Sequence, residues 1–408
     1  FRTIRMDLQW LERVLKGKLG EEVVVKEVGD LVEADVGFMS SLRRVSLDWK
    51  TDKSEHLPKT VIVKMPQCQQ TLDVFNNTEA KADDRLIEIS LRFHEVESSI
   101  YSLFDEEPAP FGIPRAFAAY KIDSGHPAIV MEDITGATTT DVVDGFSEHQ
   151  VMSILNEQVD LHVYSLTNDK WKNLPLKTPK PREGAEVIRG MVDSSIPVLI
   201  AKYPKYAKLS VVMKEVVDKI EWYPTYHDIY EQHKLSVIAH GDMWNSNFLW
   251  KGDELAAIVD WQLSHAGSIM EDIQKILSIC VTVETRKRVR GPVLERYRYL
   301  VNERLRAQGS DIEITEEIIE EEYKTTLPWS VGFGLFALCF WCNSPVLNRN
   351  DGKDDARKME ILDRVLSFSE EYLEAYPVTS EEATERKTSK CQDIANERKE
   401  SKTTERSH

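Results

Sequence analysis

The chain has 408 residues, of which 41% are hydrophobic and 30% charged, and its formal net charge is −17. This length allows two lobes with a large core, and the acidic excess excludes a general affinity for nucleic acid or anionic membranes. No run reaches the roughly 20 apolar residues of a membrane helix, so we expect no membrane span. The sparse cysteines, with Cys339 and Cys342 inside an apolar run, predict a buried helix face and a reducing, cytoplasmic setting.

The N-terminal part of the chain changes from a helical to a strand-like pattern. An amphipathic helix is predicted over residues 7–19, and Gly20 ends it. Two strand-like runs follow and bracket the segment 35–41. Gly37 and Ser40 are small residues there, and small residues let backbone N–H groups approach a phosphate. We therefore predict a phosphate-covering loop at this turn, with a plain hairpin turn as the alternative.

The next elements can hold and contact a nucleotide. A β-run ends at Lys64, which fits the strand lysine that contacts the α- and β-phosphates of ATP. Such a lysine needs a carboxylate from a helix, and the helix predicted over residues 79–104 offers Glu95 and Glu97. The two alternatives stay open on spacing alone.

A buried strand is predicted at residues 128–131, immediately before a polar segment. Glu132 and Ile134 are expected in a hinge whose backbone meets the adenine, while Asp133 is equally consistent with a simple cap. We place the boundary between the lobes near residue 134. The N-lobe then covers residues 1–134 and a helical C-lobe covers residues 135–376.

The C-lobe begins with helical patterns up to about residue 235. Ser147 and Gln150 form the pattern of a capping box, and His162 is expected in the core. Residues 172–186 are rich in Pro and Lys and predict an exposed loop. Short helices are expected near 194–202 and 206–221.

Residues 236–272 carry the most informative pattern in the chain. His240, Gly241 and Asp242 are followed after four residues by Asn247, and two β-runs around a turn lead to Asp260. A hairpin would bring Asp242, Asn247 and Asp260 to one end. Two carboxylates and an amide carbonyl are oxygen ligands that Mg²⁺ prefers. In phosphoryl transfer, one Asp orients the attacking hydroxyl, and an Asn and a second Asp hold Mg²⁺.

This pattern, H-G-D-x-W-x-x-N followed by D-W-Q, resembles the choline kinase/aminoglycoside phosphotransferase-like superfamily. The closest branch is the CHK-kinase-like group, which includes ecdysteroid-kinase-like proteins and a large nematode set, and the resemblance covers roughly residues 5–375. It implies an α+β, two-lobed protein-kinase-like fold, with a small β-rich N-lobe and a larger helical C-lobe. It also favours Glu97, four residues before Tyr101, as the partner of Lys64. Asp272 is implied to brace the catalytic loop, and Asp35 departs from the family's richer glycine pattern.

The C-terminal part adds further helices and a tail. Helices are predicted near 292–307 and 315–324, and aromatic residues over 327–347 suit core packing or a wall of the acceptor pocket. Residues 377–408 lack aromatic residues and apolar periodicity, which predicts disorder.

The sequence therefore predicts an ATP- and Mg²⁺-dependent kinase for a hydroxyl group of a small molecule. Asp242 is the expected base, Asn247 and Asp260 the Mg²⁺ ligands, and Lys64 the phosphate contact. The absence of a long activation segment between Asp260 and Asp272 argues against a protein kinase. A catalytically silent binding module is the alternative. The acceptor stays open among choline-, ethanolamine-, steroid-, sugar- and xenobiotic-like alcohols, as does the oligomeric state.

Overall fold

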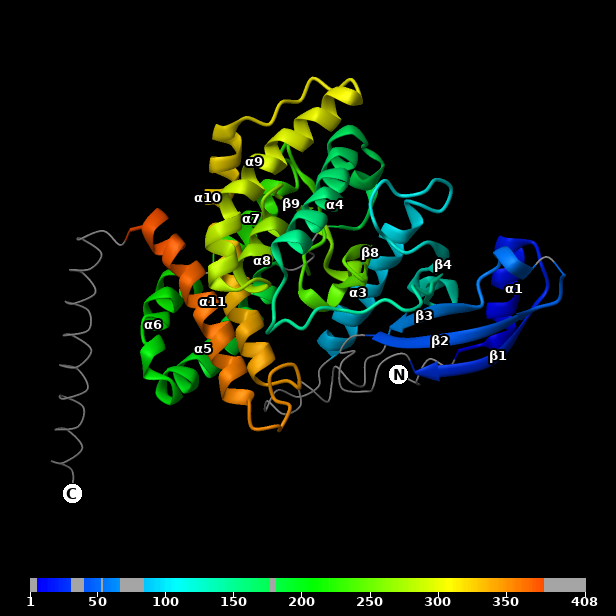
Figure 1. The fold of residues 1–408 in the computed structure, drawn as a ribbon, viewed down its shortest axis with the longest axis horizontal. Helices are drawn as coiled ribbons and strands as arrows, with labels where there is room; N and C mark the ends of the chain where they lie inside the picture. The colour runs from blue at the N-terminus through cyan, green and yellow to red at the C-terminus, as the bar shows by residue number, and fades with distance from the viewer. Residues whose placement is uncertain are drawn as a thin grey trace.

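The structure is a computed structural model that describes residues 6–30, 40–52, 54–66, 84–176, 181–219 and 221–377. A β-sheet with two helices forms one end of the molecule, and helices form most of the other (Figure 1). This arrangement confirms the expected two-lobed α+β fold. Gly37 and the tail from residue 378 lie outside the described residues, and the boundary near residue 134 stays a prediction.

The N-lobe is an antiparallel five-stranded sheet with the strand order β1-β2-β3-β5-β4. Its strands are β1 (Val23–Asp30), β2 (Ser40–Trp49), β3 (Thr60–Pro66), β4 (Ala116–Tyr120) and β5 (Ala128–Glu132). Ser40, expected in a phosphate-covering loop, is the first residue of β2 and pairs with Pro66. Strand β2 therefore begins within the last part of the predicted loop.

The two faces of the sheet bury different helices, because side chains alternate along each strand. Val61 and Val63 of β3 pack in a cluster with α1 (Leu8–Leu19). Ile62 belongs to a second cluster, which also contains residues of α3 (Asp84–Ser102). Lys64 lies two residues after Ile62 and therefore shares the α3 face. The alternation of β3 thus directs Lys64 toward the helix that was predicted to hold it.

Helix α1 begins and ends as the sequence predicts. The side chain of Asp7 accepts a hydrogen bond from the backbone N–H of Trp10 at 3.1 Å, and Gly20 ends the helix with φ of 79°. Glycine reaches this left-handed conformation without the steric cost that a β-carbon adds.

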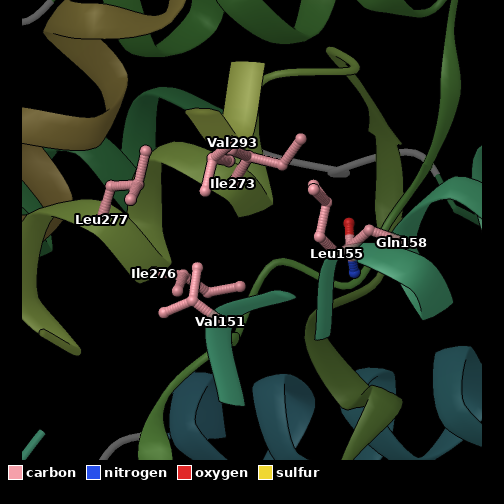
Figure 2. Close-up of a pocket in the computed structure, with 7 residues that line it drawn as sticks. All are labelled: Val151, Leu155, Gln158, Ile273, Ile276, Leu277 and Val293. Atoms are coloured by element: carbon pink, nitrogen blue, oxygen red, sulfur yellow. The ribbon is translucent and has the colours of Figure 1, made fainter. Parts of the chain in front are cut away.

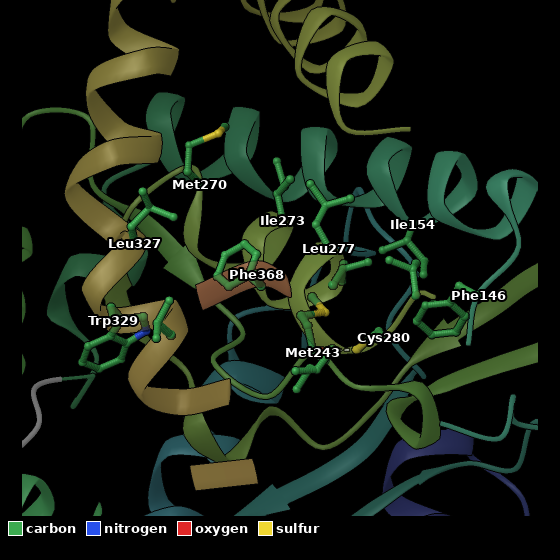
Figure 3. Close-up of a cluster of buried hydrophobic side chains, with 14 of the residues drawn as sticks. Phe146, Ile154, Met243, Met270, Ile273, Leu277, Cys280, Leu327, Trp329 and Phe368 are labelled. Carbon is green, nitrogen blue, oxygen red and sulfur yellow. Dashed lines mark hydrogen bonds between the residues drawn. The ribbon is translucent and has the colours of Figure 1, made fainter. Parts of the chain in front are cut away.

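The C-lobe surrounds one continuous apolar core (Figure 3). Its helices are α4 (Glu148–Thr167), α5 (Pro181–Lys202), α6 (Leu209–Val212), α7 (Trp222–Tyr230), α8 (Glu271–Ile279), α9 (Val283–Ala307), α10 (Glu316–Cys342) and α11 (Asp354–Ala375). All nine residues of α8 are buried, and α8 packs against α4, α9, α10 and α11. Helix α8 is therefore the centre of the lobe, and it follows the predicted catalytic segment directly.

Three boundaries in the C-lobe differ from the sequence prediction. Helix α5 begins at Pro181, so residues 181–186 are not the exposed loop that was predicted. Proline suits the first helical turn, where its missing N–H is not needed. Helix α9 begins at Val283, after the Thr282 cap, and α10 continues through Pro328. Extensive packing offsets the hydrogen bond that this proline removes.

Most of the expected core residues are buried. His162 is 1% exposed and contacts the Tyr297 hydroxyl at 2.8 Å, while Cys339 and Cys342 are buried free thiols in α10. Helix α10 has an 18-residue window with hydropathy of 1.4, so by length and composition it could cross a membrane. This differs from the expectation from sequence, but 67% of that window is buried inside the protein, as in the core helix of a globular protein.

Candidate active site

A two-stranded hairpin brings the predicted catalytic positions together. Strands β7 (Phe248–Lys251) and β8 (Glu254–Ile258) pair around a turn at Gly252. Beyond their paired ends, the backbone N–H of Val259 donates to the Asn247 carbonyl at 2.9 Å. Asp260 is the next residue, so its backbone lies close to that of Asn247 in space, as expected for the predicted hairpin.

A second pair of strands fixes the loop that contains Asp242. Strands β6 (Val237–Ala239) and β9 (His265–Gly267) are antiparallel, and His240 follows β6 directly. Asp272, at the start of α8, accepts hydrogen bonds from the backbone N–H groups of His240 at 2.7 Å and Gly241 at 3.0 Å. The contacts implied for Asp272 by family resemblance are thus present.

Gly241 is required by the shape of this loop. Its φ is 77°, and a β-carbon there would lie 2.5 Å from the backbone oxygen of Leu263. Protein kinases carry an arginine at this place of the motif. The structure gives a steric reason for glycine here, because any side chain would meet backbone that cannot move aside.

The His240 side chain holds the Asp242 loop against the residues that follow β8. It is fully buried, its Nε2 lies 3.0 Å from the Val259 carbonyl, and its ring contacts the Trp261 ring edge-on with centres 4.6 Å apart. Burial lowers the pKa of His240 to about 4, so the ring is neutral at physiological pH. His240 therefore joins the Asp242 loop to the end of β8 without adding charge.

The Asp242 carboxylate is partly accessible and has a donor on each oxygen. The Asn247 side-chain amide donates to Oδ2 at 3.2 Å and to the Asp242 carbonyl at 2.8 Å. The Lys275 ammonium donates to Oδ1 at 3.2 Å. Burial raises the pKa of Asp242, against the opposing charge of Lys275. A carboxylate with a raised pKa is better suited to accept a proton from a hydroxyl group.

Asp260 joins the two lobes. Lys64 Nζ lies 2.6 Å from Asp260 Oδ1 and 2.6 Å from Glu97 Oε2. The Lys64 and Glu97 side chains are 6% and 1% exposed, whereas the side chain of Glu95 is 38% exposed. The carboxylate that holds Lys64 on α3 is therefore Glu97 and not Glu95.

Burial and charge act in opposite directions on this ion pair. Burial lowers the pKa of Lys64, but the carboxylates of Asp260 and Glu97 outweigh it and raise the pKa above its ordinary value. Burial also raises the pKa of Glu97, which Lys64 opposes. Lys64 is therefore a cation across the physiological range, as a phosphate contact requires.

The backbone at Asp260 is unusual. Its φ is 68°, in the left-handed region, where only one other non-glycine residue among those described is found. Aspartate tolerates this region better than most residues, but the conformation still costs free energy. Strain at Asp260, two residues after β8, fits a carboxylate placed for function, because a relaxed backbone would direct the side chain elsewhere.

The hinge segment is fixed by an ion pair that the sequence did not predict. Asp133 accepts two hydrogen bonds from the Arg44 guanidinium, at 2.8 and 3.0 Å, and a third from Thr60 at 2.7 Å. Asp133 therefore ties the end of β5 to β2 and β3. The Glu132 N–H donates to the Arg115 carbonyl at 2.8 Å, so the neighbouring backbone is part of the sheet.

The donor set at the hairpin suits Mg²⁺. Asn247 uses its amide nitrogen on Asp242, which leaves an amide oxygen for another ligand, and the Asp260 side chain is 29% exposed. Amide and carboxylate oxygens with free coordination positions for phosphate and water are what Mg²⁺ takes in nucleotide sites. Within the described residues, no group of three or more His, Cys, Asp or Glu side chains is placed to hold a metal ion.

Two polar features of the site were missed from the sequence. Lys275 reaches the loop from one turn along α8, and a helical spacing of three from Asp272 is the signal that could have found it. His265 Nε2 lies 3.0 Å from Glu271 Oε2, and the Tyr226 hydroxyl also contacts Glu271. No sequence spacing indicates this second group, because Tyr226 belongs to a separate helix.

A small cavity in the C-lobe is not a substrate site. It lies between α4, α8 and α9 and has a volume of about 10 Å³ (Figure 2). Its lining is apolar except for Gln158. A space this size holds at most one water molecule, so the cavity is a packing defect of the core.

Comparison with known proteins finds two similar proteins of Caenorhabditis elegans. The protein named Uncharacterized oxidoreductase dhs-27 of Caenorhabditis elegans is 26% identical over 280 residues, which are 64% of this chain and 33% of that protein. The Uncharacterized kinase-like protein D1044.1 of the same organism is 25% identical over 303 residues, covering 70% of this chain and 77% of that one. The chain thus spans a third of the first relative.

The solved structure of choline kinase from Cryptosporidium parvum Iowa II shares the fold. It matches with a TM-score of 0.50 and 12% identity, over 86% of this chain and 91% of that chain. This match confirms the expected resemblance to the choline kinase/aminoglycoside phosphotransferase-like superfamily at the level of fold.

The match covers only 33% of the relative that has the name oxidoreductase, so most of that protein lies outside the match. The letters of a dinucleotide fingerprint, G-x-G-x-x-A, do occur at residues 332–337, but they lie inside α10 and do not join a strand to a helix. The family model described as Uncharacterized oxidoreductase dhs-27 matches residues 11–365, so the chain belongs to this DUF1679 family.

Proposed function

We propose that the chain is a phosphotransferase that moves the γ-phosphoryl group of ATP to a hydroxyl group of a small molecule. The observation that carries this proposal is the position of Lys64 Nζ, 2.6 Å from both Glu97 and Asp260. One ammonium thereby connects a strand of the N-lobe, a helix of the N-lobe and Asp260, which follows the β7–β8 hairpin. Phosphoryl transfer needs this combination of a phosphate-binding cation with an acidic loop.

Asp242 is the proposed base. The hydroxyl oxygen of the acceptor attacks the γ-phosphorus while the bond from that phosphorus to the β,γ-bridging oxygen breaks, and ADP leaves with the electron pair. The hydroxyl proton passes to the Asp242 carboxylate. Asn247 supports this role because its amide nitrogen holds Asp242, so the carboxylate faces the acceptor in one orientation. Positioning and charge stabilisation supply most of the rate in such a reaction.

The nucleotide is proposed to lie between the lobes. Lys64 contacts the α- and β-phosphates, and Ser40, the first residue of β2, is proposed to cover them. The backbone of Glu132 and Ile134 meets the adenine, and the Arg44–Asp133 pair keeps this hinge attached to the sheet. Asn247 and Asp260 would hold Mg²⁺, which would supply positive charge at the phosphate oxygens.

The acceptor is proposed to be an alcohol bound beside Asp242 and α10. Trp244 and Phe333 are partly exposed, and the Phe333 ring packs against the buried Trp329 with ring centres 4.7 Å apart. The Lys275 ammonium already lies 5.4 Å from the centre of the Phe333 ring. A second cation on that ring would meet like charge, so this face favours a neutral alcohol over a choline-like one.

Transfer of a labelled γ-phosphate from ATP into a small-molecule extract tests the proposal. The parent protein, with Mg²⁺, is run beside Asp242→Asn and Asp260→Ala. We expect a labelled metabolite from the parent alone. Asp242→Asn should lower turnover by about 100-fold or more, because a general base contributes about that much, while Mg-ATP still raises its melting temperature.

The other outcomes separate the alternatives. Retained transfer in Asp242→Asn would contradict the role of this carboxylate. No transfer by the parent, with an ATP-dependent rise in melting temperature, would favour the silent binding module. Neither transfer nor an ATP effect would refute nucleotide chemistry at this site.

A further inference from the structure

Helix α8 contacts the loop of Asp242 at two points on one face. The Asp272 carboxylate accepts hydrogen bonds from the backbone N–H groups of His240 and Gly241. Three residues later, Lys275 Nζ donates to the Gly241 carbonyl at 2.7 Å and to Asp242 Oδ1 at 3.2 Å. Residues three apart lie on the same side of a helix. One face of α8 therefore satisfies backbone donors and a backbone acceptor of the loop, and also reaches the reactive carboxylate.

The charge of Lys275 needs an explanation beyond packing. Its side chain is 11% exposed, and a buried cation is costly unless it is paired. Asp272 already holds the loop through two backbone hydrogen bonds, and an uncharged side chain of similar length would fill the space. Among the described residues, Asp242 is the carboxylate with which Lys275 forms an ion pair.

We infer that Lys275 is a positioning residue for Asp242, an inference that rests on the proposed phosphotransfer. The ammonium donates to Oδ1 and the Asn247 amide to Oδ2, so each carboxylate oxygen has one donor. Two donors on opposite oxygens fix the rotation of the carboxylate plane. The carboxylate is thereby aimed before the acceptor arrives.

The charge also matters during the reaction. Asp242 works near Asp260, and the transferring phosphoryl group brings further negative charge to both. Lys275 offsets this repulsion without taking a proton, because the hydroxyl proton passes to Asp242 and the electron pair leaves with ADP. A carboxylate misplaced by about 1 Å is expected to cost about 100-fold in rate.

Three variants test the inference. Lys275→Met removes the charge at similar length, Lys275→Arg keeps it, and Lys287→Met changes an exposed lysine of α9 as a control. The turnover number and the KM for ATP are measured with labelled ATP and the metabolite labelled in the transfer assay. The rise in melting temperature with Mg-ATP is recorded for each variant.

We expect Lys275→Met to lower kcat by about 100-fold while the KM for ATP and the Mg-ATP melting shift stay near those of the parent. Lys275→Arg should recover at least tenfold of that loss, and Lys287→Met should match the parent. If the Met variant does not fold, Lys275→Gln, which is a donor without charge, takes its place.

Three results would overturn the inference. They are a kcat within threefold of the parent in the uncharged variant, an Arg variant no better than Met, or a parallel loss of the Mg-ATP melting shift. The last result would assign Lys275 to loop structure alone. If the parent transfers phosphate and substitution of Lys275 does not change the rate, only this inference is refuted. No transfer by the parent refutes the proposed function and, with it, any reaction for Lys275 to assist.

Discussion

The catalytic segment, residues 236–272, contacts helix α10, but different interactions hold each of the two in place. In the catalytic segment, polar contacts fix the chain, from the Asp272 bonds to two backbone N–H groups to the Asn247 bond with Asp242. In α10, ring packing fixes it, with Trp329 stacked on Tyr226 at 4.2 Å between ring centres.

This difference explains which features can vary without loss of the fold. A hydrogen-bonded loop depends on single atoms at set places, and one lost donor leaves a buried group unsatisfied. A packed helix depends on volume, and many apolar residues can supply a given volume. We therefore expect polar substitutions to have the largest effects near the catalytic segment, and shape to decide the outcome along α10.

The largest effect is expected for Lys64→Met. This change leaves Glu97, whose side chain is 1% exposed, without its cation and beside Asp260. Breaking a buried ion pair by removing one partner costs about 3–5 kcal/mol. Urea unfolding measures the loss, and the Mg-ATP melting shift should disappear with it.

Lys202→Met is the matched control, because Lys202 and Asp355 form a pair with side chains 53% and 58% exposed. We expect a much smaller loss of stability there, because an ion pair exposed to water contributes little. Equal effects of the two variants would mean that the buried pair does not hold the lobes together.

A smaller but still large effect is expected for Gly241→Ala. The new β-carbon would lie 2.5 Å from the Leu263 oxygen and would also need φ of 77°. Left-handed backbone costs about 1–2 kcal/mol for a non-glycine residue, and crowding in a packed region adds about 1–3 kcal/mol. Thermal unfolding and transfer activity should both show the loss.

Gly252→Ala separates the two causes. Gly252 has φ of 62° in the β7–β8 turn, and a β-carbon there would have nothing within 4 Å. Only the backbone cost of about 1–2 kcal/mol should remain. If both alanine variants lose the same stability, the contact with Leu263 carries no weight.

Helix α10 offers a comparison between two of its own glycines. A β-carbon at Gly332 would lie 2.3 Å from Trp222, whose ring is held by a hydrogen bond to the Val216 carbonyl at 2.6 Å. At Gly334 the nearest atom is 3.7 Å away, on Ile279. We expect Gly332→Ala to destabilise by about 1–3 kcal/mol. Gly334→Ala should stabilise by up to about 1 kcal/mol, because alanine favours helix.

Urea unfolding of the two variants gives the sign directly. Stabilisation by both would show that Trp222 can move aside. A loss in both would mean that α10 tolerates no added methyl group on either side, and that its packing is as exact a requirement as the hydrogen bonds of the catalytic segment.

The sequence predicted the catalytic segment because its spacing is local. Asp242, Asn247 and Asp260 lie within 19 positions, and alternating apolar residues between them specify a hairpin. The Lys64–Glu97 pair needed the family resemblance, since spacing alone left Glu95 as a rival. The roles of these residues in catalysis stay predictions, while their positions are set by the structure.

Contacts between distant segments could not be read in this way. The Arg44–Asp133 pair spans 89 positions and the Tyr226–Glu271 contact spans 45. The continuity of α10 through Pro328 depends on neighbouring helices and not on its own propensity. Such features follow from the packed fold, so a single sequence carries no local signal for them.

The smallest effect is expected where the two regions meet, at the His265–Glu271 pair, which packs beside Trp329. Burial lowers the pKa of His265, but Glu271 outweighs it and the pKa is raised from 6.5. Burial raises the pKa of Glu271, but His265 outweighs it and the pKa is lowered from 4.5. The nearby His227 has a pKa lowered to about 3 by burial and stays neutral.

The two shifts give the pair a pH window. The raised pKa of His265 stabilises the fold below pH 6.5, and this contribution is lost as the pH rises through the folded pKa. The lowered pKa of Glu271 stabilises it above pH 4.5, and this contribution is lost as the pH falls through the folded pKa. The difference in unfolding free energy between the parent and His265→Gln should therefore be greatest between these two pH values and smaller at pH 8. Urea unfolding from pH 4 to pH 8 measures this difference. A difference that does not change with pH would mean that the charges of His265 and Glu271 do not stabilise the contact between the catalytic segment and α10.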